Sequence, residues 1–119
     1  MQSQRYEISQ QQSVQVLSLA LPDVMDGMEI DALIESVLRA LEGKSRQPWV
    51  MDLNDVQYMG SAMLGLMVNV RQRILQGGGK LVLCGMSQQL LHIFQTCCLE
   101  RLFTIAKTRP DALAMATRS

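Results

Sequence analysis

Two short and mostly apolar runs constrain the fold of this chain more than any other feature of its sequence. They occupy residues 49–53 and 80–84, and each is followed by a stretch whose apolar residues recur at helical spacing. Apolar runs of this length are typical of strands covered on both faces by helices, as in parallel sheets. The sequence therefore predicts an α/β fold in which these two strands lie near the centre of the sheet.

The remaining segments complete this pattern. Residues 6–8 and 14–21 alternate apolar and polar side chains, which predicts two strands joined by a turn at residues 10–13. Apolar spacing and the N-cap candidates Ser87 and Thr108 predict helices at about residues 30–41, 61–76, 87–98 and 108–115. A last short strand is expected at residues 102–105, with a loop at 22–27 and a turn at 54–55. The order β-β-α-β-α-β-α-β-α predicts a mixed, mostly parallel β-sheet of about five strands, with about four α-helices and an N-terminal β-hairpin.

Length and charge narrow the class of protein. A chain of 119 residues predicts a single domain spanning residues 1–119. The formal net charge is zero, with 11 basic and 11 acidic side chains, so no basic field would attract nucleic acid or an anionic membrane. The chain starts without the apolar run of a signal peptide, and no apolar stretch is as long as a membrane span. We therefore expect neither nucleic-acid binding nor membrane insertion.

The cysteines indicate the compartment. The chain has three, Cys84, Cys97 and Cys98, of which two are adjacent. An odd number with this spacing argues against a disulfide framework and for a reducing environment. The sequence therefore predicts a cytoplasmic protein.

The most informative segment covers residues 51–65. A predicted strand carries Asp52 near its end, and after a short excursion Gly60 and Ser61 begin a helix. A glycine at this place would allow a sharp turn of the backbone and leave the serine uncrowded. A serine at the start of a helix can cap the free amides with its own oxygen. When it is phosphorylated instead, the helix dipole and the free amides stabilise the added charge.

This segment resembles the STAS family of anti-sigma factor antagonists. The family pattern is a V-x-D-L strand, followed by an apolar pair, a serine pair with Asp or Ala, and Leu-Gly. In this chain Val50–Leu53 matches the strand, Ser61-Ala62 matches the serine segment, and Leu64-Gly65 matches the final pair. The resemblance continues through residues 77–84, similar to the "G-G-x-L-x-L" strand, and through residues 99–105, similar to "L-x-x-L-F-x-I". These matches run in order from Val50 to Ala114, which is more than half of the chain.

The resemblance implies a STAS fold and a switch that works by docking. Ser61 aligns with the serine that an anti-sigma factor serine kinase phosphorylates and that a PP2C-type phosphatase restores. The partner-binding residues implied by the family are Asp52, Gly60, Ser61, Ala62, Met63 and Leu64, with Asp52 making the surface electronegative. Such a module is no enzyme, needs no cofactor or metal, and is expected to be a monomer or a weak dimer. Two departures place the chain in a Ser-Ala-x-Leu-Gly subgroup: Gly60 replaces the Asp of many antagonists, and Met63 replaces a Gly.

Several alternatives stay open at this point. Ser61 can be only a helix cap, and the module can be a STAS scaffold that is never phosphorylated, in a stress-signalling or lipid-transport complex. Surplus apolar residues on the predicted helix 61–76 can contact a neighbouring helix or face a partner. A third class is a small enzyme using a cysteine or the pair Asp52 and Asp55. The lone His92 offers no base for either, and Asn54-Asp55 is better explained as a turn.

Overall fold

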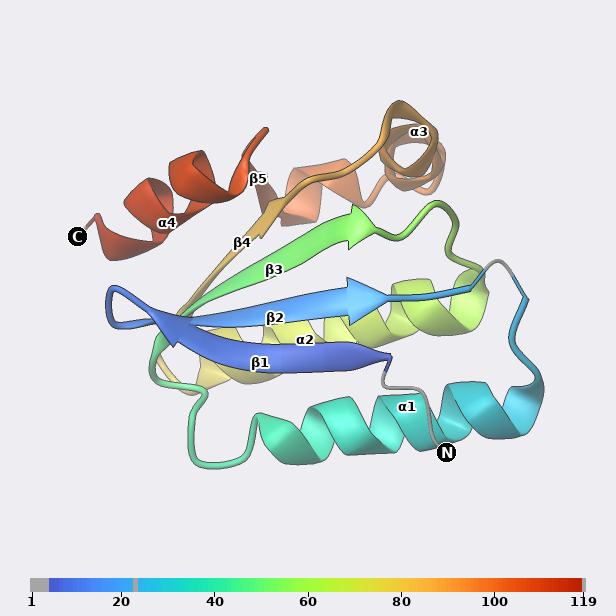
Figure 1. Ribbon diagram of the computed structural model, residues 1–119, viewed down its shortest axis with the longest axis horizontal. Coiled ribbons are helices and arrows are strands. Elements are labelled where there is room, and N and C mark those ends of the chain that lie inside the picture. Colours follow the sequence, from blue (N-terminus) through green and yellow to red (C-terminus); the bar gives the residue numbers. More distant parts are fainter. Residues whose placement is uncertain (1–4, 23, 119) are drawn as a thin grey trace.

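A five-stranded mixed sheet forms the centre of the computed structural model, which describes residues 5–22 and 24–118 (Figure 1). The strand order is β1-β2-β3-β4-β5. Strands β1 and β2 form an antiparallel hairpin, and β2, β3, β4 and β5 pair in parallel, as the sequence predicts. The two strands predicted to lie near the centre are β3 and β4, and each has a neighbouring strand on both sides. The bounds are β1 Tyr6–Gln11, β2 Val14–Ala20, β3 Pro48–Asp55, β4 Lys80–Cys84 and β5 Thr104–Ile105.

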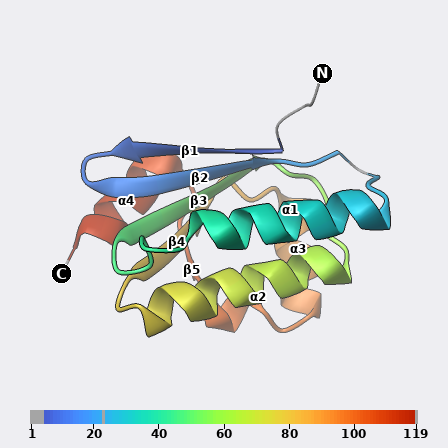
Figure 2. The same cartoon turned by 90° about the horizontal axis from the view of Figure 1, so that it is seen from below.

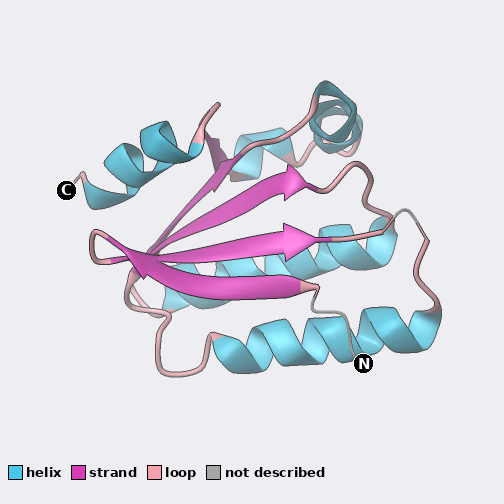
Figure 3. Ribbon diagram, in the orientation of Figure 1, coloured by secondary structure: helices cyan, strands magenta, loops and turns pink. Residues whose placement is uncertain are grey.

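Helices cover both faces of this sheet (Figures 2 and 3). Helices α1 and α2 run side by side in the same direction on one face, and α4 lies on the other face. In the described residues there are four α-helices and one short 3₁₀ helix, η1. Their bounds are α1 Gly27–Ala40, α2 Ser61–Gln76, α3 Gln88–Thr96, η1 Glu100–Leu102 and α4 Arg109–Thr117.

The alternation of side chains along β3 divides the core in two. Trp49, Met51 and Leu53 pack into the larger cluster with side chains from α1, α2 and α3. Val50 packs into a second cluster, with Val82 of β4 and small side chains of α4. Successive side chains of a strand point to opposite faces, so one short strand anchors both layers.

Several element boundaries follow local capping chemistry. Asp26 and Glu29 form a capping box at the start of α1, and Ser87 and Thr108 cap α3 and α4 as predicted. Helix α1 begins at Gly27, so the predicted loop at 22–27 is one residue too long, and its residue 23 lies outside the described residues. The four N-terminal residues, part of the segment searched for a signal peptide, also lie outside them.

Three other predicted boundaries differ from the structure. Asn54 and Asp55 belong to β3 instead of forming a turn, because Asp55 still pairs with Ala20 of β2 beyond the apolar run. The last strand starts at Thr104, since Leu102 belongs to η1. The first hairpin is also tighter than expected, because only Gln12 and Ser13 lie between β1 and β2.

Candidate functional site

Ser61 is exposed at the first position of α2, where the chain leaves the carboxyl end of β3. The N-cap is Gly60, whose carbonyl accepts the first helical hydrogen bond, from the Leu64 amide at 3.0 Å. The helix start has no side-chain cap and no acidic residue in its first turn. Within the described residues, the Ser61 hydroxyl has no hydrogen-bond partner. The interpretation of Ser61 as a helix cap is therefore wrong, because the backbone enters the helix one residue earlier.

Gly60 does not have the role that the sequence predicts for it. Its φ of −84° and ψ of −177° are extended values that any residue adopts. A Cβ atom at Gly60 would meet only the Tyr58 ring, at 3.7 Å and beyond, which is ordinary contact. The turn into α2 therefore needs no glycine, and the prediction of a sharp glycine turn is wrong.

An apolar pocket of about 210 Å³ lies beside the start of α2. It forms where the loop after β2 meets the loop before α2, and its lining includes Leu21, Val24, Met25, Ile30, Tyr58 and Met63. Val24 and Tyr58 are also exposed, at 84% and 50% of their surface. Large exposed apolar side chains around a hollow are typical of a surface that binds another protein. Sequence reasoning missed this pocket because its two loops are far apart in the chain.

The residues implied by the family differ in their burial. Ser61 and Ala62 are exposed, and Gly60 and Leu64 are half-buried, so these four form a continuous surface at the start of α2. Met63 is only 4% exposed and packs into the core cluster. Its side chain lines the apolar pocket, so it can support a docking surface but not project from it.

Asp52 lies in different surroundings from those expected. Its carboxylate accepts a hydrogen bond from Arg109 Nε at 2.8 Å and from the Asn54 amide at 2.9 Å. Arg109 also donates to the Ser18 hydroxyl at 3.0 Å. The Asp52 side chain is 13% exposed and faces α4, while α2 covers the opposite face of the sheet. An ion pair with Arg109 offsets its charge, so the expectation that Asp52 makes the docking surface electronegative is wrong.

Gly85 completes the surroundings of Asp52. It follows β4 with a φ of +74°, a left-handed value that favours glycine. A Cβ atom there would lie 2.9 Å from the Asp52 carboxylate and 3.0 Å from the Asn54 amide nitrogen. Glycine at position 85 therefore allows the carboxyl ends of β3 and β4 to pack closely around the Asp52 side chain.

Of the cysteines considered for catalysis, Cys84 is poorly placed for it. Cys84 is fully buried, and burial, with a smaller contribution from the Asp52 charge, raises the pKa of its thiol to about 11. Its thiol is therefore protonated near neutral pH and is a weak nucleophile. Cys97 and Cys98 are exposed at the end of α3. Within residues 5–22 and 24–118, no three His, Cys, Asp or Glu side chains are grouped to hold a metal ion.

The apolar residues of α2 differ in their burial. The stripe Met63, Leu66, Met67, Val70 and Ile74 is buried against the sheet. Leu64 is half-buried against the same core, which favours helix contact as its explanation. Leu75, in contrast, is 47% exposed at the far end of the helix.

Comparison with known proteins assigns the class. The model of the STAS domain matches residues 5–112, and the chain therefore belongs to the STAS domain family. It is 29% identical over 103 residues to BtrV of Bordetella bronchiseptica, which is named as an anti-sigma factor antagonist; the match covers 77% of this chain and 89% of BtrV.

Solved structures agree with the fold. A STAS domain protein from Planctomyces limnophilus superposes with a TM-score of 0.82 and 21% identity, covering 95% of this chain and 98% of that one. SpoIIAA in its unphosphorylated form superposes with a TM-score of 0.68 and 15% identity, and the match covers 92% of this chain and 94% of that one. The phosphorylated form of SpoIIAA from Bacillus has a TM-score of 0.65 and 15% identity, and the match covers 92% of this chain and 97% of that one. Among the helices that the structure describes, none has the length and apolar character needed to cross a membrane.

Proposed function

We propose that this chain is an anti-sigma factor antagonist that docks to an anti-sigma factor serine kinase and is released when Ser61 is phosphorylated. The observation that carries the proposal is the exposed Ser61 hydroxyl, which no cap interaction occupies, beside an apolar pocket. Membership of the STAS family and the relative named as an anti-sigma factor antagonist support it. The chain would act by binding alone, as a single module in the cytoplasm, without catalysis of its own.

The start of α2 suits a phosphoserine. Its first turn carries no acidic side chain that would repel a phosphate, and its amides have no side-chain cap. A phosphate adds about two negative charges, and the positive end of a helix stabilises such charge by about 0.3–1 kcal/mol. Phosphorylation of Ser61 is therefore expected to leave α2 folded and to change only the surface that it presents.

The effect on docking follows from desolvation. The docking surface that we propose consists of Gly60, Ser61, Ala62 and Leu64 together with the apolar pocket beside them. A partner that covers this surface would have to strip water from a dianionic phosphate, which is strongly unfavourable without a paired cation. We expect the phosphorylated chain to bind the kinase at least about tenfold more weakly.

Gly65 extends this surface by one helical turn. It lies four residues after Ser61 on the same side of α2, it is exposed, and no atom lies within 4 Å of the place where its Cβ would be. A glycine inside a helix costs about 1 kcal/mol relative to alanine. Nothing in the described chain needs this glycine, so we propose that the partner approaches the backbone closely at this point.

Phosphorylation of the purified chain by its kinase tests the proposal. With ATP, the mass should increase by one phosphate, on Ser61, and a PP2C-type phosphatase should reverse the increase. Ser61→Ala should abolish it, whereas Thr96→Ala, which removes another exposed hydroxyl, should not. Phosphate on Ser61→Ala would contradict the site. If the chain binds the kinase stably and no phosphate is transferred, the alternative is favoured: a STAS scaffold that is never phosphorylated, in a stress-signalling or lipid-transport complex.

A further inference from the structure

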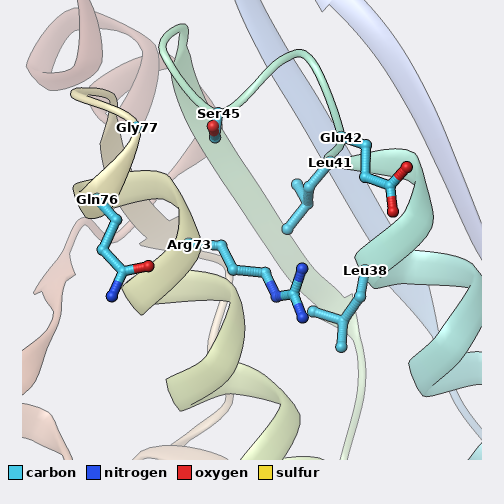
Figure 4. A pocket seen from close by; sticks show the side chains of 7 residues that line it. All are labelled: Leu38, Leu41, Glu42, Ser45, Arg73, Gln76 and Gly77. Atoms are coloured by element: carbon cyan, nitrogen blue, oxygen red, sulfur yellow. The ribbon is translucent and has the colours of Figure 1, made fainter.

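Two surface features lie at opposite ends of α1. Before and within its first turn, Val24 and Met28 are 84% and 83% exposed, more than any other large apolar residue in the described part of the chain. Beyond its last turn, a pocket of about 270 Å³ opens between the ends of α1 and α2. We call these the apolar tip, formed by Val24 and Met28, and the end pocket, lined by Leu38, Leu41, Glu42, Ser45, Arg73 and Gln76 (Figure 4).

The two ends also carry opposite charge. Around the apolar tip, Asp26 caps α1 and Glu29 and Asp31 lie on its first turns. Arg5 pairs with Glu29, which leaves Asp26 and Asp31, and residues 24–38 themselves contain no Lys or Arg. Around the end pocket cations outnumber acids: Arg73 and Glu42 line the pocket, and Lys44 and Arg46 follow in the sequence. Arg39 also lies there, but it is paired with Glu35. Since α1 runs along the length of the sheet (Figure 1), the two charged regions are well separated in one molecule.

Arg73 is the central side chain of the end pocket. It extends from α2 across the opening toward Leu38 of α1 (Figure 4). In residues 5–22 and 24–118 it forms no ion pair with a carboxylate; the ion pairs there involve Arg5, Arg39 and Arg109. An exposed guanidinium beside the half-buried Leu38 side chain suits a partner that presents an apolar side chain next to a carboxylate.

We propose that this chain associates with a second copy of itself, head to tail, by inserting the apolar tip of one copy into the end pocket of the next. Asp26 and Asp31 of the first copy then face Arg73 and the neighbouring cations of the second. Charge complementarity favours a second copy as the occupant, because one chain with zero net charge carries both halves of the contact. Such a contact uses two different surfaces, so it does not close after two copies and can continue into longer chains.

The contact should be weak and sensitive to salt. Two apolar side chains and a few exposed charges form a small interface, for which a dissociation constant on the order of 0.1 mM is reasonable. In sedimentation velocity, the average sedimentation coefficient of the purified chain should therefore rise with protein concentration. Raising NaCl from about 50 mM to about 500 mM should weaken association roughly tenfold, because the charges are exposed. A monomer at every concentration up to about 1 mM would overturn the proposal.

Two variants separate this contact from any other form of association. Val24→Ser/Met28→Ser disables the apolar tip and Arg73→Glu disables the end pocket; all three residues are exposed, so both variants should fold. Each variant alone should remain monomeric, while Gln72→Glu, a matched control on α2 outside the pocket, should associate like the original chain. An equimolar mixture of the two disabled variants should form a dimer and nothing longer, because one intact tip meets one intact pocket. Association of either variant alone, or none in the mixture, would overturn the proposal.

Val24 belongs both to the apolar tip and to the apolar pocket of the kinase-docking surface, but the outcomes of the two tests can be distinguished. The experiment contains only the purified chain, and Ser61→Ala should associate as the original chain does. Failure of self-association would thus leave the kinase proposal unaffected, and absence of phosphorylation would not change the sedimentation result.

Discussion

Arg109 Nε lies 2.8 Å from Asp52 Oδ2, and this ion pair joins the first turn of α4 to the central strand of the sheet. The two residues are 57 positions apart in the sequence. Their side chains are 34% and 13% exposed, so the carboxylate in particular is shielded from water. The pair explains why an acidic side chain is tolerated within the apolar part of this strand, and it gives Asp52 a structural role on the α4 side of the sheet.

Arg109→Gln tests this role. The change leaves the shielded Asp52 carboxylate without its cation, and the free energy of unfolding should fall by about 1–3 kcal/mol. Chemical denaturation measures the loss, and combining the change with Asp52→Asn should recover part of it. Arg39→Gln is the matched control, because its ion pair with Glu35 is about 70% exposed on both sides. That variant should change stability by less than about 0.5 kcal/mol, and equal effects of the two arginine variants would contradict the structural role.

Gly65→Ala separates stability from docking. Because the added methyl group meets open space, the variant should be more stable by about 0.5–1 kcal/mol. If the partner approaches the backbone at Gly65, the same methyl group should weaken kinase binding by about tenfold, measurable by calorimetry. Asn69→Ala, one turn further along α2 and also exposed, should raise stability and leave affinity unchanged. Unchanged affinity of Gly65→Ala would remove this residue from the proposed docking surface.

The buried Cys84 thiol should make stability fall at alkaline pH. Burial raises its pKa from 9.0 to about 11 in the folded chain, so between these values the unfolded chain loses the proton and the folded chain keeps it. The contribution of the neutral thiol is therefore fully present below pH 9 and is lost as the pH rises toward 11. The slope is at most about 1.4 kcal/mol per pH unit. Denaturation at pH 8, 9 and 10 should show this extra slope in the original chain and not in Cys84→Ala; parallel curves would contradict it.

Local periodicity was sufficient to predict most of the fold. The buried stripe of α2 was predicted because its members recur at helical spacing, and β3 was predicted because its apolar run is short. Contacts between distant segments left no such signal. The ion pair of Asp52 with Arg109 and the pocket between the loops near Val24 and Tyr58 depend on the three-dimensional arrangement of the chain. The family resemblance pointed to Ser61, but only the backbone geometry shows that Gly60 takes the cap position.

Cys98 occupies a position that favours glycine, and this leads to a stability prediction. Helix α3 ends in a Schellman motif, in which the Leu99 amide donates to the Phe94 carbonyl at 2.8 Å and the Cys98 amide to the Gln95 carbonyl at 3.0 Å. This motif places Cys98 at a φ of +59°, where a side chain costs about 1–2 kcal/mol.

Cys98→Gly should therefore raise the free energy of unfolding by about 0.5–1 kcal/mol, after the greater flexibility of glycine in the unfolded chain is subtracted. The neighbouring Cys97 is the matched control, because it is also exposed but has a φ of −88°. Cys97→Gly gains nothing from relieved strain and should lower stability by a similar amount. Both changes can be measured by thermal or chemical denaturation under reducing conditions. Opposite signs for two adjacent cysteines would show that the backbone conformation of Cys98, and not the loss of a thiol, determines the effect.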